Sequence, residues 1–421
     1  MKKQLFLLLG LGWACLASAQ ALFQQTSLYP DDHLSPAFHA DRRAAFKAAM
    51  PARSMAVFFA SQVRLRNDDV DYPYAQNKNF YYLTGLEEPN SALLLFKEPV
   101  TLGGKTSTEF LFVQARDPQK ELWTGKILGV EGVKARWGWE TVLLNSAFDP
   151  KAFPAAAIDT VLSLYQRETV LETYPRTRDA LSQMATQLDQ WLKAQAKPLA
   201  PSKTVQIMTQ LRAIKTPEEI KLLEKATAMS CAGHNAVMAG IRPGMTEYQA
   251  QAIMEYQFKI NGAEFFGYPS INGAADNACV LHYVTNKKRI NNGELLLSDC
   301  AAEYHGYTAD VTRTVPANGK FSPEQKIIYE LVLAAQDSAI AACVPGNPFS
   351  ITDVISRRVI NRGLIRLGIA ANEAEARQYF PHGTSHHLGL DVHDLGPRGN
   401  SPFQPGMSNG GTLGCALKTI F

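Results

Sequence analysis

Short apolar runs alternate with amphipathic stretches over the first half of the chain. The runs at residues 56–59, 92–96 and 109–113 are bounded by turn-forming residues, which predicts three buried strands. Residues 178–193 carry apolar side chains at helical spacing, which predicts a helix. This succession of strands and helices indicates an α/β domain over residues 38–195, a usual size for one domain.

The pattern changes after this domain. Residues 196–215 open with two prolines and no periodicity, which predicts a linker. A helical pattern then follows Thr216, where Glu219 completes a capping box, and helices of the same kind follow Thr246 and Ser322. Between the last two, the sequence predicts strands at residues 279–283, 294–299 and 307–315. A second domain, with both helices and strands, is therefore expected over residues 216–421.

Composition excludes some classes of partner. The chain has 421 residues and is 46% hydrophobic, enough for two domains with cores of their own. Its 42 basic and 39 acidic residues nearly balance, and no block of basic residues occurs. Nothing in the charge pattern therefore favours binding to nucleic acid or to an anionic surface.

The first residues have the pattern of a secretory signal peptide. Lys2 and Lys3 precede an apolar run over residues 5–16, and Ala17-Ser18-Ala19 is typical of a cleavage site. The run is too short to span a bilayer comfortably. We expect residues 1–19 to be removed and the chain to be exported to the periplasm or secreted, with no membrane attachment afterwards. An uncut membrane anchor is the alternative.

Five cysteines follow the expected cleavage site. They are scattered, odd in number and without CxxC spacing, so we interpret them as small buried hydrophobic residues and not as a disulfide framework or a zinc site. They are Cys231, Cys279, Cys300, Cys343 and Cys415.

Two aspartates suggest a cation site. Asp299 ends one predicted strand and Asp310 lies near the start of the next, so a hairpin-like connection through residues 303–306 would place them side by side. Two close carboxylates repel each other, and one takes up a proton unless a cation lies between them. Oxygen ligands with one histidine favour Mn, Co, Zn or Fe. Taken alone, both aspartates could also be ordinary turn or capping residues.

A histidine cluster strengthens the cation hypothesis. His382, His386, His387 and His393 fall within a dozen residues, out of nine histidines in the whole chain. A lone histidine is more often structural, whereas a cluster flanked by glycine is more typical of a site. The residues that follow, 388–394, alternate in polarity as a strand does.

Several longer motifs resemble one enzyme family. They are RRAAF, DYPYAQNKNFYYLTGLEEPNSALLLF, LRAIKTPEEIKLLEKA, CVLHYVTN, LLLSDCAAEYHGYTADVTRTVPANGKFSPEQ and HGTSHHLGLDVHDLG. The chain resembles, from about Arg42 to Met407, the Xaa-Pro aminopeptidases (aminopeptidase P) among the metallopeptidases with the creatinase or "pita-bread" fold. This resemblance implies an α/β N-terminal domain followed by an α+β pita-bread catalytic domain.

The resemblance also implies roles for six residues. Asp299, Asp310 and His386 would be metal ligands for two divalent ions, with Mn²⁺ expected and Co²⁺ or Zn²⁺ as alternatives. His282 would hold the substrate or the departing group, and His393 would contact the substrate carbonyl or the tetrahedral intermediate. His382 would line the same pocket. His305 and His387 match no role in the family, and we interpret both as non-catalytic.

The implied substrates are peptides with proline at the second position. A water activated by the metal ions would attack the carbonyl before the proline. The nearest alternative within the family is a prolidase that cleaves Xaa-Pro dipeptides. The family commonly forms homo-oligomers, in which a first-domain tryptophan can reach a neighbouring subunit's site. Trp123 matches that residue, although packing in the core is the interpretation that we favour.

Two segments depart from the family pattern. Cys300 and Ala301 follow Asp299 where the family has a small residue and then glycine, and we expect a modest effect because alanine restricts the backbone. The larger departure follows Met407. There the family continues into a strand with a ligand glutamate in Thr-Val-Glu-Pro-Gly, and a later strand carries a second, bridging glutamate.

Neither glutamate has a counterpart in residues 408–421. We therefore expect a catalytic domain that lacks its C-terminal strands, an exposed sheet edge, weak metal binding and little turnover. The codons for residues 409–412 allow a frame shifted by one base to read Thr-Val-Glu-Pro, which suggests a frameshift or a sequencing error near Ser408. The alternative is a truncated family member without catalytic activity.

Overall fold

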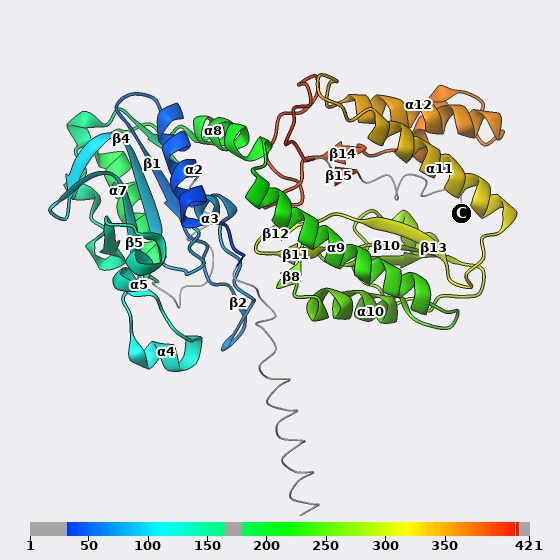
Figure 1. Ribbon diagram of the computed structural model, residues 1–421, viewed down its shortest axis with the longest axis horizontal. Helices are drawn as coiled ribbons and strands as arrows, with labels where there is room; N and C mark the ends of the chain where they lie inside the picture. Colours follow the sequence, from blue (N-terminus) through cyan, green and yellow to red (C-terminus); the bar gives the residue numbers. More distant parts are fainter. Residues whose placement is uncertain (1–31, 165–178, 409, 412–421) are drawn as a thin grey trace, which may run out of the picture.

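Two sheet-containing domains are joined by one helix (Figure 1). The computed structural model describes residues 32–164, 179–408 and 410–411 of the chain. The expected signal peptide, Cys415 and most of the departing C-terminal segment lie outside these residues. Within the described part of the chain, no helix is both long and apolar enough to cross a membrane.

A five-stranded sheet organises the first domain, with strand order β6-β5-β4-β1-β7. β1 is antiparallel to β4 and parallel to β7. A separate two-stranded ribbon pairs β2 with β3. The strands are β1 (Ser54–Phe59), β2 (Leu65–Asn67), β3 (Val70–Asp71), β4 (Ala92–Leu102), β5 (Lys105–Val113), β6 (Val142–Leu144) and β7 (Thr160–Leu162). The helices are α2 (Pro36–Ala49), α3 (Lys78–Thr84), α4 (Pro118–Thr124), α5 (Gly129–Trp137) and α7 (Ala180–Ala194).

Both faces of this sheet are buried, as the continuous apolar runs predict. Successive side chains of a strand point to opposite faces. Met55 and Val57 of β1 therefore pack in the cluster that contains the apolar face of α7. Ala56 and Phe58 pack in the other cluster, with α2 and α3. The predicted strands and the predicted helix at residues 178–193 are confirmed, although β4 and β5 extend beyond their predicted ends.

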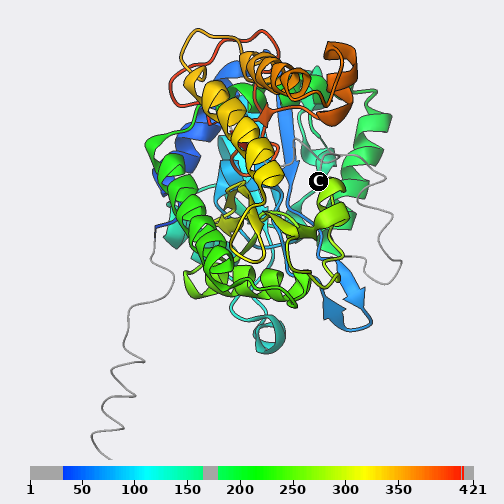
Figure 2. The ribbon, with the colours of Figure 1, turned by 90° about the vertical axis from the view of Figure 1, so that its right-hand side faces the viewer.

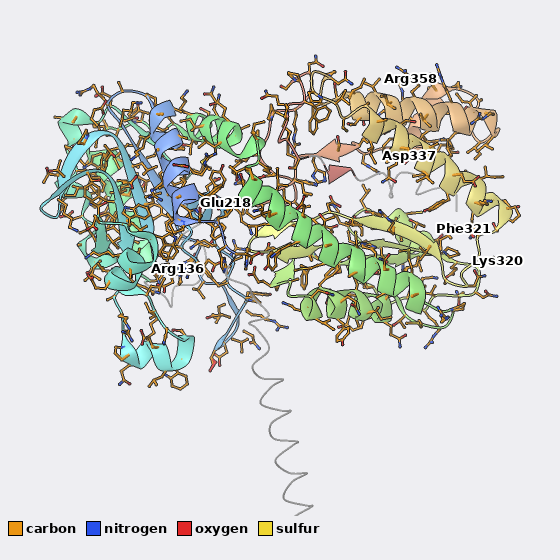
Figure 3. The ribbon with its side chains drawn as sticks, in the orientation of Figure 1. Arg136, Glu218, Lys320, Phe321, Asp337 and Arg358 are labelled. Atoms are coloured by element: carbon orange, nitrogen blue, oxygen red, sulfur yellow. The ribbon has the colours of Figure 1, made fainter. Side chains whose placement is uncertain are left out.

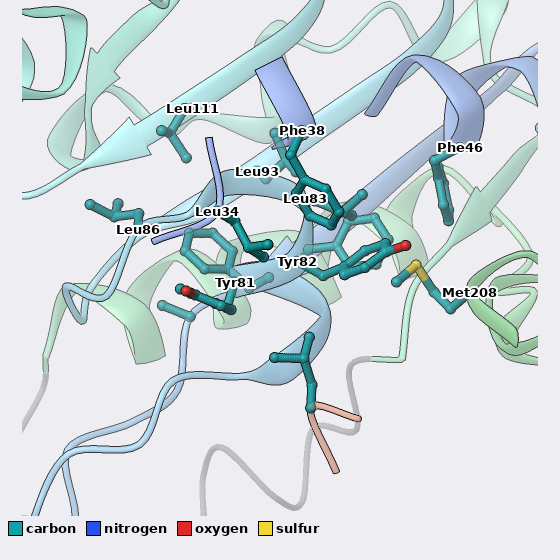
Figure 4. Close-up of a cluster of buried hydrophobic side chains, with 14 of the residues drawn as sticks. Leu34, Phe38, Phe46, Tyr81, Tyr82, Leu83, Leu86, Leu93, Leu111 and Met208 are labelled. Carbon is teal, nitrogen blue, oxygen red and sulfur yellow. The ribbon is translucent and has the colours of Figure 1, made fainter. Parts of the chain in front are cut away.

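The apolar cluster that contains α2 and α3 continues across the junction between the two domains. Figure 4 shows Tyr82 of α3 close to Phe38 of α2 and Met208 of the joining helix α8 (Pro201–Ala213). The same cluster includes Tyr304 and Tyr307 of the second domain. The two domains therefore share one apolar core and do not meet only through a flexible connection.

Polar contacts fix the same junction. Glu218, at the end of α9 (Pro217–Gly240) that faces the first domain in Figure 3, accepts hydrogen bonds from the backbone N–H and hydroxyl of Ser35. Tyr82 Oη donates to the carbonyl of Leu211 over 2.8 Å. The segment 196–215, predicted as a linker, is largely helical because α8 occupies most of it.

The second domain stacks helices on both sides of a small sheet (Figures 1 and 2). α10 (Glu247–Ile260) packs below the sheet β13-β10-β9, α9 packs on α10 and on β11 and β12, and α11 (Pro323–Ala341) lies above with α12 (Ile351–Arg366). α13 (Glu373–Ala376) follows. The strands are β8 (Phe265–Phe266), β9 (Ile271–Ala274), β10 (Leu295–Asp299), β11 (Ala302–Tyr304), β12 (Tyr307–Thr308), β13 (Thr312–Pro316), β14 (Ser385–His386) and β15 (Gly410–Gly411).

The three predicted helix starts are confirmed. α9, α10 and α11 each begin with a reciprocal capping box. The hydroxyl of the cap residue accepts a hydrogen bond from the backbone N–H of the third helical residue. The side chain of that third residue accepts one from the backbone N–H of the cap residue. The cap residues are Thr216, Thr246 and Ser322.

Three predicted strands differ from the structure. Residues 279–283 form the end of a 3₁₀ helix and a loop, because the buried carboxylate of Glu247 binds this segment through side-chain hydrogen bonds. Residues 307–315 form two strands, β12 and β13, which belong to different sheets. Residues 388–394 form a series of bends, because charged side chains from another segment hold them. At residues 279–283 and 388–394, distant side chains therefore override a local pattern.

Two predictions about single residues were wrong. Trp123 does not pack in the core: it lies on α4 and is 90% exposed. Cys231 is exposed on α9, whereas Cys300 is buried as expected and Cys279 and Cys343 are partly buried.

Candidate metal and catalytic site

One cavity of about 530 Å³ brings the six candidate residues together. Its lining includes Asp299, Asp310, His386, His282, His393 and His382. These residues come from three separate segments of the second domain, namely the loop after β9, the β10–β13 region and the segment around β14. Apolar side chains, among them Ile271, Leu281 and Val284, form much of the remaining wall.

The sheet positions the two aspartates. Asp299 is the last residue of β10, where it pairs with Thr312 of β13. Asp310 does not start a strand but lies in the break between β12 and β13, where the chain passes from one sheet to the other. The predicted hairpin connection is confirmed: β11 and β12 are joined by a two-residue turn of His305 and Gly306, both at positive φ.

A buried tyrosine hydroxyl joins the two carboxylates. Tyr268 Oη lies 2.7 Å from Asp299 Oδ1 and 3.2 Å from Asp310 Oδ1. Burial, and then the neighbouring Asp310 charge, raise the pKa of Asp299 to about 6. Burial and the same two carboxylates raise the pKa of the Tyr268 phenol well above its usual value, so this group remains a hydrogen-bond donor.

His386 completes the polar cluster from β14. Its Nε2 lies 2.9 Å from Asp310 Oδ2, and its Nδ1 lies 3.0 Å from the carbonyl oxygen of His387. Burial lowers the pKa of His386, but the hydrogen bonds to Asp310 and to backbone carbonyls, together with the Asp310 charge, outweigh it, and the pKa is raised overall. The ring of His393 lies 4.2 Å from that of His386, centroid to centroid. Burial and the neighbouring His386 lower the pKa of His393.

These donors fit a divalent cation by their chemistry. Two carboxylates and one imidazole are the ligand types that Mn²⁺, Co²⁺ and Zn²⁺ accept. Burial and the neighbouring Asp310 charge disfavour the ionised form of Asp299, and a bound cation would favour it. Across residues 32–164 and 179–408, however, no three such side chains converge on one point, since Asp310 and His386 pair directly. A bound cation would take the place of this direct hydrogen bond.

A buried carboxylate holds the loop that carries His282. Glu247, at the first position of α10, is fully buried. It accepts from the hydroxyl of Tyr283 over 2.8 Å, from the side chain of Asn277 over 2.9 Å and from the backbone N–H of Lys288 over 2.8 Å. Tyr283 directly follows His282, so this network determines where the exposed His282 side chain enters the cavity.

α12 positions His382. Arg357 donates to the backbone carbonyls of Phe380 and His382, each over 2.7 Å, and pairs with Asp353 one turn earlier. The Asp353 carboxylate also accepts from the Thr384 hydroxyl. Nε2 of His382 is buried and has no hydrogen-bond partner among the described residues.

The other two histidines of these motifs lie elsewhere. His387 is buried, with Nε2 2.7 Å from the carbonyl oxygen of Pro397 and its ring stacked on Phe349. His305 is buried at the domain junction, where its ring nitrogens contact Glu264 and Asp32. Neither residue lines the cavity.

Among the cavity residues that sequence reasoning missed are Tyr268 and Arg398. Tyr268 precedes Pro269 in a short segment without periodicity, so no local signal marks it. A general rule could have flagged it, because a buried tyrosine hydroxyl usually has a polar partner. Arg398 lies five residues after His393 in a loop of bends and turns, which the sequence marks only by its glycines and prolines.

Comparisons with known proteins cover both domains. The chain matches the family models "Metallopeptidase family M24" over residues 221–413 and "Aminopeptidase P, N-terminal domain" over residues 39–159. It is 34% identical to a Xaa-Pro aminopeptidase of Haemophilus influenzae, over 85% of this chain and 80% of that protein. It is 33% identical to that of Escherichia coli, over 87% and 83%. A solved aminopeptidase structure from Pseudomonas aeruginosa matches with a TM-score of 0.76 at 32% identity, covering 89% of this chain and 85% of that one.

Proposed function

The chain belongs to the Xaa-Pro aminopeptidases of metallopeptidase family M24, and on this premise we propose that it releases the N-terminal residue from peptides whose second residue is proline. The observation that carries the proposal is the cavity that gathers Asp299, Asp310 and His386 with three further histidines. We propose that these three residues hold two divalent ions, with Mn²⁺ as the native metal.

The protein's own residues have distinct tasks in this proposal. A bound divalent ion would supply a water of lowered pKa as the nucleophile. His393, whose lowered pKa keeps it neutral at pH 7, donates a ring N–H toward the scissile carbonyl oxygen, where negative charge develops. His282 holds the substrate or the departing group, and His382 lines the same cavity. Proline has no N–H to satisfy, which suits the apolar wall formed by Ile271, Leu281 and Val284.

Metal binding and turnover test this proposal together. The structure describes three donors for two ions, so we expect the 421-residue chain to bind Mn²⁺ weakly and to hydrolyse Xaa-Pro-Xaa peptides slowly. Calorimetric titration with Mn²⁺ and a peptide assay at several metal concentrations measure both. Turnover should rise with metal concentration and disappear with a chelator.

Three outcomes would contradict this prediction in part or in whole. Two tightly bound ions per chain would show that the described donors are sufficient or that others contribute. Cleavage of Xaa-Pro dipeptides in preference to tripeptides would instead favour a prolidase. No turnover at saturating Mn²⁺, on peptides of any length, would reject the proposed activity.

We propose further that the chain is exported. The support is the sequence pattern of Lys2 and Lys3, the apolar residues 5–16 and the small residues 17–19. The mature protein should be recovered outside the cytoplasm with Gln20 as its first residue, which N-terminal sequencing measures. A cytoplasmic protein that retains Met1 would contradict this localisation.

A homo-oligomer is also proposed. Its support is the exposed end of α4, where Leu122 is 77% and Trp123 90% exposed, since two adjacent large apolar side chains in water are typical of an interaction surface. Light scattering of the purified chain tests this assembly.

A further inference from the structure

A buried network of charges lies beside the cavity. Arg212, near the end of α8, is 2% exposed, Lys215 is 4% exposed and Asp394 is 3% exposed. One Asp394 oxygen accepts from Arg212, and the other accepts from Lys215 Nζ over 2.8 Å. Arg212 also donates to Asp391 Oδ2 over 2.7 Å, so two cations face two carboxylates.

This network holds the segment that carries two candidate site residues. Asp394 directly follows His393 in the chain. Its backbone N–H donates to the carbonyl of His387 over 2.9 Å, and His387 directly follows His386. Asp394 therefore links the backbone next to His393 with the backbone next to His386.

The segment is packed too closely to move by itself. A Cβ added to Gly389 would lie 2.0 Å from Asp394 Oδ2, so no side chain other than glycine's fits between them. The carbonyl of Gly389 also accepts from the backbone N–H of Thr308, two residues before Asp310. The position of Asp394 is thus linked to both the histidine and the aspartate side of the cavity.

The same arginine reaches into the first domain. Arg212 Nη1 donates to Asn79 Oδ1 over 2.8 Å, and Asn79 lies on α3. In Figure 1 the segment after β14 passes the end of α8 that points toward the second domain, which agrees with these contacts. One guanidinium group therefore joins the first domain, the connecting helix and the histidine segment.

A planar guanidinium suits this task better than an ammonium group would. It offers donors in fixed directions, so three acceptors can be held at set angles at once. A buried ion pair adds little net stability compared with apolar residues of similar size. Its best-attested use is to specify one conformation of the groups around it. These considerations favour a geometric role for Arg212 over a purely stabilising one.

We propose that Arg212 is a positioning residue for the peptidase reaction. Through Asp394 and Asp391 it sets the place of His393 and His386 in the cavity, and through Asn79 it makes that place depend on the first domain. The expected change in kcat rests on the proposed function, whereas the expected change in the position of His393 does not.

The test is Arg212→Lys, which keeps the positive charge but removes the planar guanidinium group and its fixed donor directions. In ¹⁵N-histidine NMR spectra, the ring signals of His393, assigned with His393→Gln, should shift. In the peptide assay at saturating Mn²⁺, kcat should fall by roughly ten- to a hundredfold with KM nearly unchanged, the size of loss that a small misplacement causes. Arg43→Lys is the matched control, because Arg43 is also buried and pairs with Glu109, within the first domain.

Arg43→Lys should leave both the His393 signals and kcat at their wild-type values. The proposal is overturned if Arg212→Lys shows wild-type ring signals, or if both variants shift them equally. Should Arg212→Lys fail to fold, Asp391→Asn decides, since the Asp391 side chain is 46% exposed and tolerates change better. Unshifted His393 signals in that variant would also reject the proposal. If the wild type itself hydrolyses no peptide, the proposed function fails while the NMR comparison still decides the positioning role.

Discussion

Replacing Asp394 by asparagine should lower the free energy of unfolding by about 3–5 kcal/mol, the usual result of removing one partner from a buried ion pair. The side chains of Asp394 and Lys215 are each 1% exposed, and that of Arg212 is 2% exposed. Asparagine has nearly the same shape, so the change removes charge without opening a cavity. Lys215 and Arg212 then remain buried with too little negative charge to compensate them.

Urea denaturation at pH 7 measures this difference. Asp159→Asn is the control: it breaks the exposed ion pair with Arg53, and surface pairs of this kind contribute little. A midpoint for Asp394→Asn as close to wild type as that of the control would show that water reaches the network and compensates its charges.

Replacing Asp299 by asparagine should stabilise the metal-free protein at pH 7 while abolishing metal-dependent turnover. The pKa of Asp299 is raised from 3.8 to about 6 in the folded protein, so the folded state binds the proton more tightly than the unfolded state. This contribution to stability is complete below about pH 4 and is lost as the pH rises to about 6. At pH 7 the ionised group disfavours folding by about 3 kcal/mol, at 1.4 kcal/mol for each pKa unit.

The measurement is denaturation between pH 4 and pH 8 in the presence of a chelator. The wild type should lose stability over the lower half of this range relative to Asp299→Asn, which lacks the titrating group. Excess Mn²⁺ should reduce the difference, because a bound cation favours the ionised form. Equal pH profiles for the two proteins would mean that the Asp299 carboxylate is compensated by other groups.

The sequence predicts those parts of the structure whose causes are local. Thr216, Thr246 and Ser322 start helices because a capping box involves residues only three apart. The strands of the first domain follow from short apolar runs. The placing of Asp299 beside Asp310 was also predictable, because the two residues lie on either side of the tight hairpin formed by β11 and β12.

The remaining features depend on contacts that no local pattern records. Residues 388–394 alternate in polarity but form bends, because their charged positions meet Arg212 and Lys215 rather than water. Residues 279–283 were mistaken for a strand because the partner of this loop, Glu247, begins a helix about 30 residues earlier. Tryptophan is a large, mostly apolar residue, so Trp123 was expected in the core. Nothing in the local sequence indicates that α4 leaves its side chain exposed.

The charge network also constrains the order in which the molecule can be completed. Arg212 is 182 residues from Asp394, and 133 residues from Asn79 on the other side. Contacts between such distant residues form slowly, because a long loop must close before they contribute. A growing chain presents Asn79, Arg212 and Lys215 long before Asp391 and Asp394 are synthesised. Both cations therefore remain solvated at the domain junction, and the segment that carries His393 takes up its position only after the final part of the described chain has been synthesised.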